Sequence, residues 1–560
     1  LAANSLVSQV VSDQTIVLPT VSRVADSLIK SVRSASSAKG AANTGPTPGP
    51  CGTSSSPEID PEALTNINAL AAQDRGYDGA GITVAYIAEG IDTTQPDFQR
   101  NSAYASSGSP TGSHVVTQYD FTGDAPGTPT PGGEAFLDAS SIAAQGNSVY
   151  DLSTFVNAAH SLPTGCDIKI IGAAPGASVM GLKVFGTTDL TTQSNFIEAI
   201  NYAVSHGVKV LNESFGANQL PDTNLDVTRM ADDAAVANGV TVVVSSGDAG
   251  IGNTIGSPAT DPNLISVGAS TTFRAYNQFT YGGINDPAHT GSWIDNNISS
   301  ISSAGFSTNP GNTVDLVAPG DLNWTLCSLN RALFTDCSDE ESPSKPTAFT
   351  DSGGTSESAP LTSGAAADVI QAYASTHSGN LPSPALIKQI LMSTATDIGA
   401  PAEEQGAGLL NINAAVNMAI SLPSSSGSKT DGQIQISPNQ VNAELAPHQT
   451  TTKTLSFTNT GSTPETVNLT SRALTDTVAT TSGSFCMQPG TPSSGCPANT
   501  GSFPIWSGVI EVYQNVPFTV GSGVSRLQFR ADYTYTGQTS LLHMALIDPN
   551  GAYAAYSIPQ

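Results

Sequence analysis

Short apolar runs alternate with amphipathic stretches from about residue 57 to residue 422. We expect the apolar runs at 82–87, 178–184, 208–212 and 240–244 to form buried strands, because they are dense in Val, Ile and Leu. The intervening stretches at 193–206 and 225–238 have the length and spacing of helices. Strands that alternate with helices predict an α/β fold, in which a parallel sheet carries helices on both faces.

The segment before this region ends in the Gly/Pro run at 45–50, which interrupts regular structure. Apolar spacing at 24–32 predicts one short helix before that run. We interpret residues 1–56 as an N-terminal arm or the remnant of a prodomain, followed by the α/β domain at 57–422.

A Ser/Gly/Lys linker at 424–432 marks the second boundary. After it, apolar and polar residues alternate with period two at 452–461 and 466–470, which predicts an immunoglobulin-like β-sandwich at 433–500. We expect residues 501–560 to be a second β-rich module, a truncated module or a part of the same C-terminal region.

The chain is strongly acidic, with 19 Lys and Arg against 46 Asp and Glu and a formal net charge of −27. Such a field repels nucleic acid and anionic membranes, so neither is an expected partner. It suits both a generic secreted surface and adaptation to acid. The longest apolar runs are too short to span a bilayer.

Six cysteines lie at 51, 166, 327, 337, 486 and 496, which allow fifteen pairings. Two pairs are close in sequence, Cys327 with Cys337 and Cys486 with Cys496, and pairing them would leave Cys51 with Cys166. An even count without a metal-type CxxC motif favours an oxidising compartment, so we expect a secreted protein.

Ser356 lies in the run Gly-Thr-Ser-Glu-Ser-Ala-Pro at 354–360, which opens a helix-forming stretch at 361–370. A serine at a sharp turn before a helix is a common presentation of an acyl-transfer nucleophile. The run resembles the serine motif of the subtilisin-like superfamily. Further blocks at about 60–420 match that superfamily in order, at 79–87, 172–177, 214–216, 257–259, 266–269 and 316–320.

Three positions depart from the subtilisin pattern. Ala88 replaces the strand-end Asp, the segment 133–139 replaces the His-containing helix, and Asp248 replaces the oxyanion Asn. His114 is the one candidate for a histidine mechanism, since the other histidines lack a catalytic context.

The replacements resemble the sedolisin family of serine-carboxyl peptidases, which keep the subtilisin-like fold. The resemblance implies catalytic roles for Glu134, Asp138, Asp248 and Ser356, with Glu134 and Asp138 spaced four apart on one helix. The competing interpretation is that the two acids belong to a solvated helix face. In the catalytic interpretation Glu134 is the base, Asp138 orients it, and protonated Asp248 stabilises the oxyanion.

The resemblance also implies that Ser214, Phe215 and Gly216 pair with the substrate backbone. Glu89 either extends the carboxyl network or points away, because neighbours on a strand face opposite sides. Asp397 and Ile398 match the opening of a sedolisin calcium loop, but the stretch at 405–411 lacks the expected ligand run.

These features predict a secreted, acid-acting endopeptidase that acts on protein or peptide substrates as a monomer, with no cofactor in the chemistry. A catalytically inactive subtilisin-like scaffold is the first alternative. An adhesion or polysaccharide-binding protein that acts through its C-terminal β domains is the second.

Overall fold

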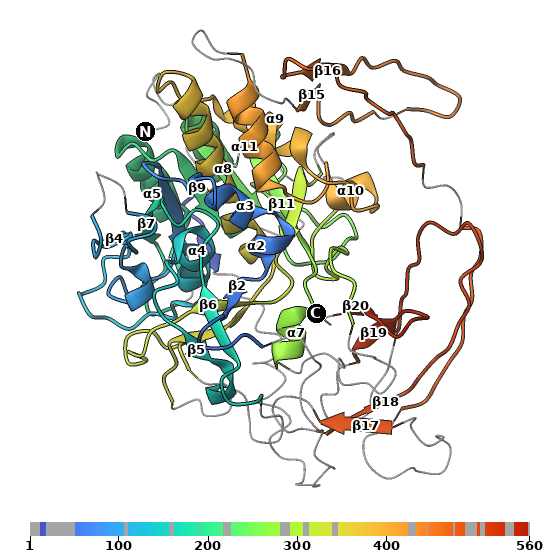
Figure 1. The fold of residues 1–560 in the computed structure, drawn as a ribbon, viewed down its shortest axis with the longest axis horizontal. Coiled ribbons are helices and arrows are strands. Elements are labelled where there is room, and N and C mark those ends of the chain that lie inside the picture. The colour runs from blue at the N-terminus through green and yellow to red at the C-terminus, as the bar shows by residue number, and fades with distance from the viewer. Residues whose placement is uncertain are drawn as a thin grey trace.

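A parallel sheet of seven strands forms the centre of the computed structural model, in the order β12-β11-β10-β9-β3-β7-β4 (Figure 1). The strands are β3 (Thr83–Ala88), β4 (Val116–Asp120), β7 (Ser178–Lys183), β9 (Val210–Glu213), β10 (Thr241–Ser245), β11 (Ile265–Ser270) and β12 (Leu316–Pro319). The structure describes residues 12–17, 51–105, 110–155, 162–188, 190–216, 226–279, 292–305, 313–338, 345–423, 433–443, 445–473, 477–487, 501–504, 510–532 and 542–557.

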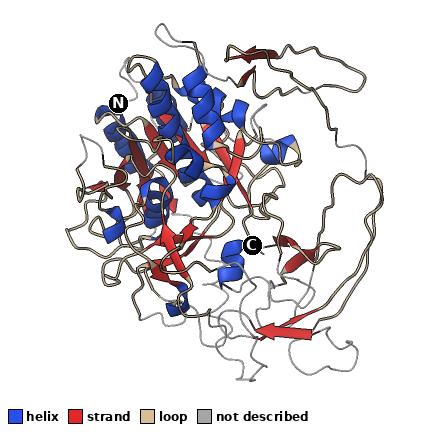
Figure 2. Cartoon of the chain, in the orientation of Figure 1, coloured by secondary structure: helices blue, strands red, loops and turns tan. Residues whose placement is uncertain are grey.

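Two separate hydrophobic cores lie on opposite faces of this sheet, and alternating strand residues supply them. In β9, Val210 belongs to the first core and Leu211 to the second. The first core includes residues of helices α4 (Gly133–Ala143), α8 (Thr355–Thr376), α9 (Pro384–Thr394) and α11 (Ile412–Ser421). The second includes residues of α5 (Gln193–Ser205) and α6 (Val227–Ala237). Figure 2 shows the helices in blue packed around the strands in red. The expected fold, a parallel sheet with helices on both faces, is therefore confirmed.

The expected strands and helices of the α/β region are present with small shifts at their ends. The predicted strand at 208–212 begins two residues later, at Val210, and the predicted helix at 193–206 is α5. Shorter helices complete the region: α2 (Ala63–Asn66), α3 (Ala69–Gln73), α7 (Arg274–Phe279) and α10 (Ala402–Gln405), with 3-10 turns at Pro96–Phe98 and Leu152–Thr154. No helix in the part of the chain that the structure describes is long and apolar enough to cross a membrane.

Small sheets flank the central one. Strands β2 (Glu58–Asp60), β6 (Asp167–Ile170) and β5 (Tyr150–Asp151) form one, and β13 (Asn323–Leu326) pairs with β14 (Phe349–Ser352) in another. At the N-terminal side, β1 (Thr15–Val17) pairs with β8 (Leu190–Thr192), so part of the arm docks on the α/β domain. The helix expected at 24–32 lies outside the described residues.

The C-terminal region contains three two-stranded antiparallel sheets within its described residues. They pair β15 (Ile434–Ser437) with β16 (Ser456–Asn459), β17 (Gly501–Pro504) with β18 (Ile510–Tyr513), and β19 (Met544–Ile547) with β20 (Tyr553–Ser557). The strand expected at 452–461 is thus shorter, and residues 466–470 form none. Alternation alone misleads here, because these stretches lack a partner strand in the described residues. The division into C-terminal domains stays a prediction.

The last of these hairpins is part of the α/β domain's core. Tyr553 is fully buried and packs edge-on against Phe273, while Tyr556 packs edge-on against Tyr276. The backbone at Trp293 also bridges to Tyr553. The hairpin of β19 and β20 therefore packs onto the α/β domain.

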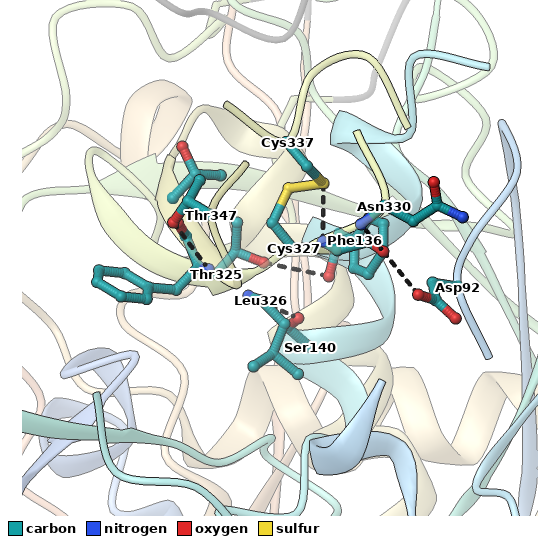
Figure 3. Close-up of a disulfide and its surroundings, with 12 residues drawn as sticks. Asp92, Phe136, Ser140, Thr325, Leu326, Cys327, Asn330, Cys337 and Thr347 are labelled. Atoms are coloured by element: carbon teal, nitrogen blue, oxygen red, sulfur yellow. Dashed lines mark hydrogen bonds between the residues drawn. A yellow bond between two sulfur atoms is a disulfide. The ribbon is translucent and has the colours of Figure 1, made fainter. Parts of the chain in front are cut away.

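Two of the expected disulfides are present, Cys51–Cys166 and Cys327–Cys337. Cys496, the expected partner of Cys486, lies outside the described residues. The Cys327–Cys337 loop packs on α4 (Figure 3): the Thr325 hydroxyl donates to the Phe136 carbonyl at 3.1 Å, and the Leu326 amide donates to Ser140 Oγ at 3.2 Å.

Removing the Cys51–Cys166 bridge should destabilise the protein more than removing Cys327–Cys337. The sequence separations are 115 and 10 residues, so the first restricts the unfolded chain far more. Paired Cys→Ser variants should lose about 4–5 and about 2–3 kcal/mol of unfolding free energy respectively. Urea unfolding of the two paired variants measures both. Equal losses would contradict the entropic origin of the difference.

Candidate active site

The side chains of Glu134 and Asp138 on helix α4 lie in the interior of the protein and not on its surface. The helix begins after Gly132, whose φ of 89° suits glycine, and every residue from Gly133 to Ala143 is buried. Glu134 is 2% exposed and Asp138 is fully buried. The two acids are therefore not a solvated helix face, which was the competing interpretation of their spacing.

Asp138 is oriented by two donors from the central sheet. Its Oδ1 accepts hydrogen bonds from Asn212 Nδ2 at 2.9 Å and from Ser214 Oγ at 2.7 Å. Its Oδ2 is buried without a hydrogen-bond partner. Burial raises the pKa of Asp138 well above its ordinary value, although the Ser214 bond opposes the rise.

Ser356 lies in the first turn of α8, where the chain leaves strand β14. Its side chain is 8% exposed, and its hydroxyl donates to the Ser214 carbonyl at 3.4 Å. Glu134 lies near Ser356, because the Ser356 side chain is among the groups that act on the pKa of Glu134. Glu134 Oε1 is buried without a hydrogen-bond partner. The pKa of Glu134 is raised well above its ordinary value, first by burial and then by the charge of Asp138.

Asp248 follows strand β10 and faces the same turn. Its Oδ1 accepts from both the Thr355 amide and the Thr355 hydroxyl at 2.8 Å, and burial raises its pKa. Because Oδ1 already accepts two bonds, a proton on this carboxyl belongs on Oδ2. The charge of Asp248 also raises the pKa of Glu134, so all four expected catalytic residues share one site.

Glu89 points into the site, which settles the question of its direction. Its side chain is 1% exposed, and Oε2 accepts from the Ala135 amide in the first turn of α4 at 3.0 Å. Burial, followed by the nearby charge of Asp336, raises the pKa of Glu89 to about 7. The charge of Glu89 in turn raises the pKa values of Glu134 and Asp138.

Glu357 is a further member of this cluster that sequence reasoning missed. It is 1% exposed, and its Oε1 accepts from Ser141 Oγ of α4 at 2.8 Å. Burial raises the pKa of Glu357 to about 8, and its charge raises the pKa of Asp138. The signal was available, because Glu357 stands in the serine motif beside Ser356, where the following helix is apolar.

The segment at 214–216 divides its roles between side chains and backbone. The Ser214 hydroxyl binds Asp138, and the Phe215 ring packs in the second core with its centroid 4.1 Å from that of Phe196. Gly216 is exposed. Its backbone is therefore the part of the segment that is open to an extended peptide, as the resemblance implies.

The residues at the expected calcium loop do not fit a calcium ion. Arg472 donates to both carboxylate oxygens of Asp397, at 2.6 and 2.7 Å, and Gln405 Nε2 donates to Oδ1 at 2.9 Å. The Ile398 amide is also occupied, donating to Gln405 Oε1 at 3.0 Å. An arginine fork supplies the positive charge that calcium would supply, and it lowers the pKa of Asp397.

His114 does not take part in this site. It is exposed, and its Nδ1 lies 2.9 Å from the Thr93 carbonyl oxygen and 3.2 Å from Gln99 Nε2. Among the described residues, none of the hydrogen-bond partners of Ser356 or of the three expected catalytic carboxyls is a histidine.

Comparison with known proteins identifies the family of this chain. The model of the subtilase family matches residues 79–408. Since that match spans more than half of the chain, the protein belongs to the subtilase family.

Three curated relatives illustrate the likeness. The minor extracellular protease Vpr of Bacillus subtilis is 33% identical over 244 residues, which cover 41% of this chain and 26% of Vpr. Subtilisin E of the same species is 28% identical over 226 residues, covering 40% of this chain and 50% of that enzyme. Subtilisin DY of Bacillus licheniformis is 25% identical over 358 residues, covering 63% and 98%. The matches span half or less of the first two relatives.

Folding stability should fall as the pH rises from about 4.5 to about 8. Glu89 and Glu357 have folded pKa values of about 7 and about 8 against an ordinary value of 4.5, so the folded state binds more protons across this window. Their stabilising effect is complete below the unfolded pKa and is lost as the pH passes the folded values. Urea unfolding of the Ser356→Ala protein across the window checks this. Stability that increases toward neutral pH would contradict the buried-carboxyl geometry.

Gly354→Ala should disable the site through Asp248. Gly354 has a φ of +99°, and an added Cβ would lie 2.6 Å from Asp248 Oδ2. We expect kcat/KM to fall by about a hundredfold or more, which is the typical cost of losing one oxyanion donor. The matched control is Gly379→Ala, with a φ of +79° and nothing within 4 Å of the new Cβ, which should cost stability alone. A similar loss of activity in both variants would show backbone strain to be the cause.

Proposed function

We propose that this protein is a secreted, acid-acting serine-carboxyl endopeptidase that hydrolyses peptide bonds through an acyl-enzyme on Ser356. The observation that carries the proposal is the buried carboxyl of Glu134, on whose pKa the Ser356 side chain acts directly. In a subtilase this position would hold histidine, and the resemblance to sedolisins supplies a carboxyl in its place.

Acylation requires a base that is aligned with the nucleophile. Ser356 Oγ attacks the scissile carbonyl carbon while Glu134 takes the hydroxyl proton. When the C–N bond breaks, Glu134 returns that proton to the leaving amine. Water then attacks the ester with Glu134 again as base, and the proton returns to Ser356 Oγ as the carboxylic acid product leaves.

Asp138 keeps Glu134 oriented and shares a proton with it. After burial, the charge of Asp138 raises the pKa of Glu134, because two adjacent charges without solvent are unfavourable. Asn212 and Ser214 fix the direction of Asp138, as a second layer of donors fixes a catalytic acid. Glu89 and Glu357 extend the cluster at either side of α4.

Asp248 completes the chemistry as the donor to the tetrahedral oxyanion. Only the protonated acid can donate, and an ionised Asp248 would repel the developing charge. Its position against Thr355 leaves Oδ2 to carry the proton, and burial favours the neutral form. Activity at acid pH follows from this requirement.

Two observations support secretion and protein substrates. The disulfides Cys51–Cys166 and Cys327–Cys337 suit an oxidising compartment. The relative Vpr is described as an extracellular protease. Peptide backbone is the expected ligand of the open segment at 214–216.

The pH profile of peptide cleavage tests the base. Wild-type activity should peak in acid and decline toward neutral pH as Asp248 ionises and as Glu134 and Asp138 lose the one proton that they share. Ser356→Ala and Glu134→Gln should each lose about a thousandfold or more in kcat, as triad variants do. Full activity in Glu134→Gln would eliminate it as the base. Labelling of Ser356 by a fluorophosphonate at acid pH distinguishes the enzyme from an inactive scaffold, which would form no adduct.

Asp248→Asn and Asp248→Ala separate the oxyanion role from simple packing. An asparagine amide donates at any pH, so Asp248→Asn should keep a larger fraction of its activity near neutral pH than the wild type does. Asp248→Ala has no donor and should lose about a hundredfold at every pH. If the two variants decline together with pH and in size, Asp248 is not the oxyanion donor.

A further inference from the structure

A second pair of buried carboxyls lies behind the substrate-binding segment. Strand β9 ends at Glu213, directly before Ser214. Asn212 and Ser214 face α4, where both donate to Asp138. Because strand residues alternate, Glu213 points to the opposite face, toward the second core and α6.

Asp232 of α6 meets Glu213 there. Both residues are fully buried, and none of their four carboxyl oxygens accepts a bond from an N–H or O–H donor. The two side chains are close enough for each to act directly on the pKa of the other. Two carboxylates are acceptors only, so this contact requires one of them to keep its proton.

The charged groups around the pair are also acidic. Asp226 acts on both members, and it caps α6 by accepting from the Thr228 amide at 3.0 Å and from Ser257 Oγ at 2.5 Å. Asp261 acts on Asp232, while Arg229 is held in an ion pair with Asp261. The surroundings therefore favour the protonated pair.

We propose that Glu213 and Asp232 share a proton and act as positioning residues for the substrate-binding segment 214–216. Loss of the shared proton would leave two adjacent charges in a dry interior, and separation of α6 from the end of β9 would relieve the repulsion. Substrate binding should then weaken before the catalytic groups themselves are displaced. The inference rests on the proposed function for the role of segment 214–216, but the proton sharing does not.

The titration behaviour agrees with the geometry. Burial raises the pKa of Glu213 to about 8, and burial followed by the charge of Glu213 raises that of Asp232 well above its ordinary value. The shared proton is thus retained in acid and lost above neutral pH. Glu213 and Asp232 are separate from Glu134 and Asp138, since they lie on the other face of β9.

Glu213→Gln tests the proposal, because its amide donates to Asp232 without a titrating proton. In wild type we expect KM for a peptide to rise about tenfold or more between about pH 5 and about pH 8, and in Glu213→Gln to rise about threefold or less. The pH dependence of kcat, set by the catalytic carboxyls, should be the same in both proteins. Asp233→Asn on the same helix is the matched control, since its carboxyl accepts from Asn263 at the surface, and it should follow wild type.

A second measurement does not depend on catalysis. In the Ser356→Ala background, Glu213→Gln should flatten the loss of unfolding free energy between about pH 5 and about pH 8. Asp232→Asn serves the same purpose should Glu213→Gln fail to fold. KM profiles that superimpose on wild type overturn the positioning role, and an unchanged stability profile overturns the shared proton. If wild type cleaves no peptide but the stability profile flattens, the proposed function fails and the proton sharing stands.

Discussion

Carboxyl groups packed around α4 without solvent are the constraint on which the rest of this site depends. Glu89, Glu134, Asp138 and Glu357 are all at most 2% exposed, and burial is the leading cause of each raised pKa. No lysine or arginine is among the main influences on these groups in the described part of the chain. Ionisation of these carboxyls is therefore unfavourable. Bound protons neutralise them, as a lysine or arginine would in an ordinary buried ion pair.

The architecture explains how such a cluster is held. Helix α4 packs against β3 and β7 of the sheet and against α8. On another side, Thr325 and Leu326 of β13, directly before Cys327, donate hydrogen bonds to the Phe136 carbonyl and to Ser140 Oγ. Phe334 of the Cys327–Cys337 loop packs edge-on against the Phe136 ring. The segment that carries this disulfide therefore supports the helix that carries Glu134.

Sequence patterns were sufficient for the framework, because buried parallel strands are marked by short apolar runs. The motif around Ser356 and the acids at 134 and 138 could also be found, since their spacing and their neighbours match a known family. The direction of the Glu89 side chain could not, because strand alternation allows either face until the helix that follows is in place. The place of Glu357 in the serine motif marked it as a candidate, but its contact with Ser141 depends on the packing of α4 against α8, which the local sequence does not show. The packing of the C-terminal hairpin on the α/β domain could not be predicted either. It depends on contacts between residues more than 250 positions apart in sequence, such as Asn297 with the Ala554 carbonyl.

That hairpin has a consequence for how the protein matures. Tyr553 is fully buried against Phe273, so an aromatic side chain from the end of the chain fills the core of the domain that contains Ser356. A nascent chain lacking β20 would have a hollow where Tyr553 belongs, and the packing of its catalytic domain would be incomplete. Full packing of the domain that contains Ser356 therefore requires the chain to be synthesised at least through β20.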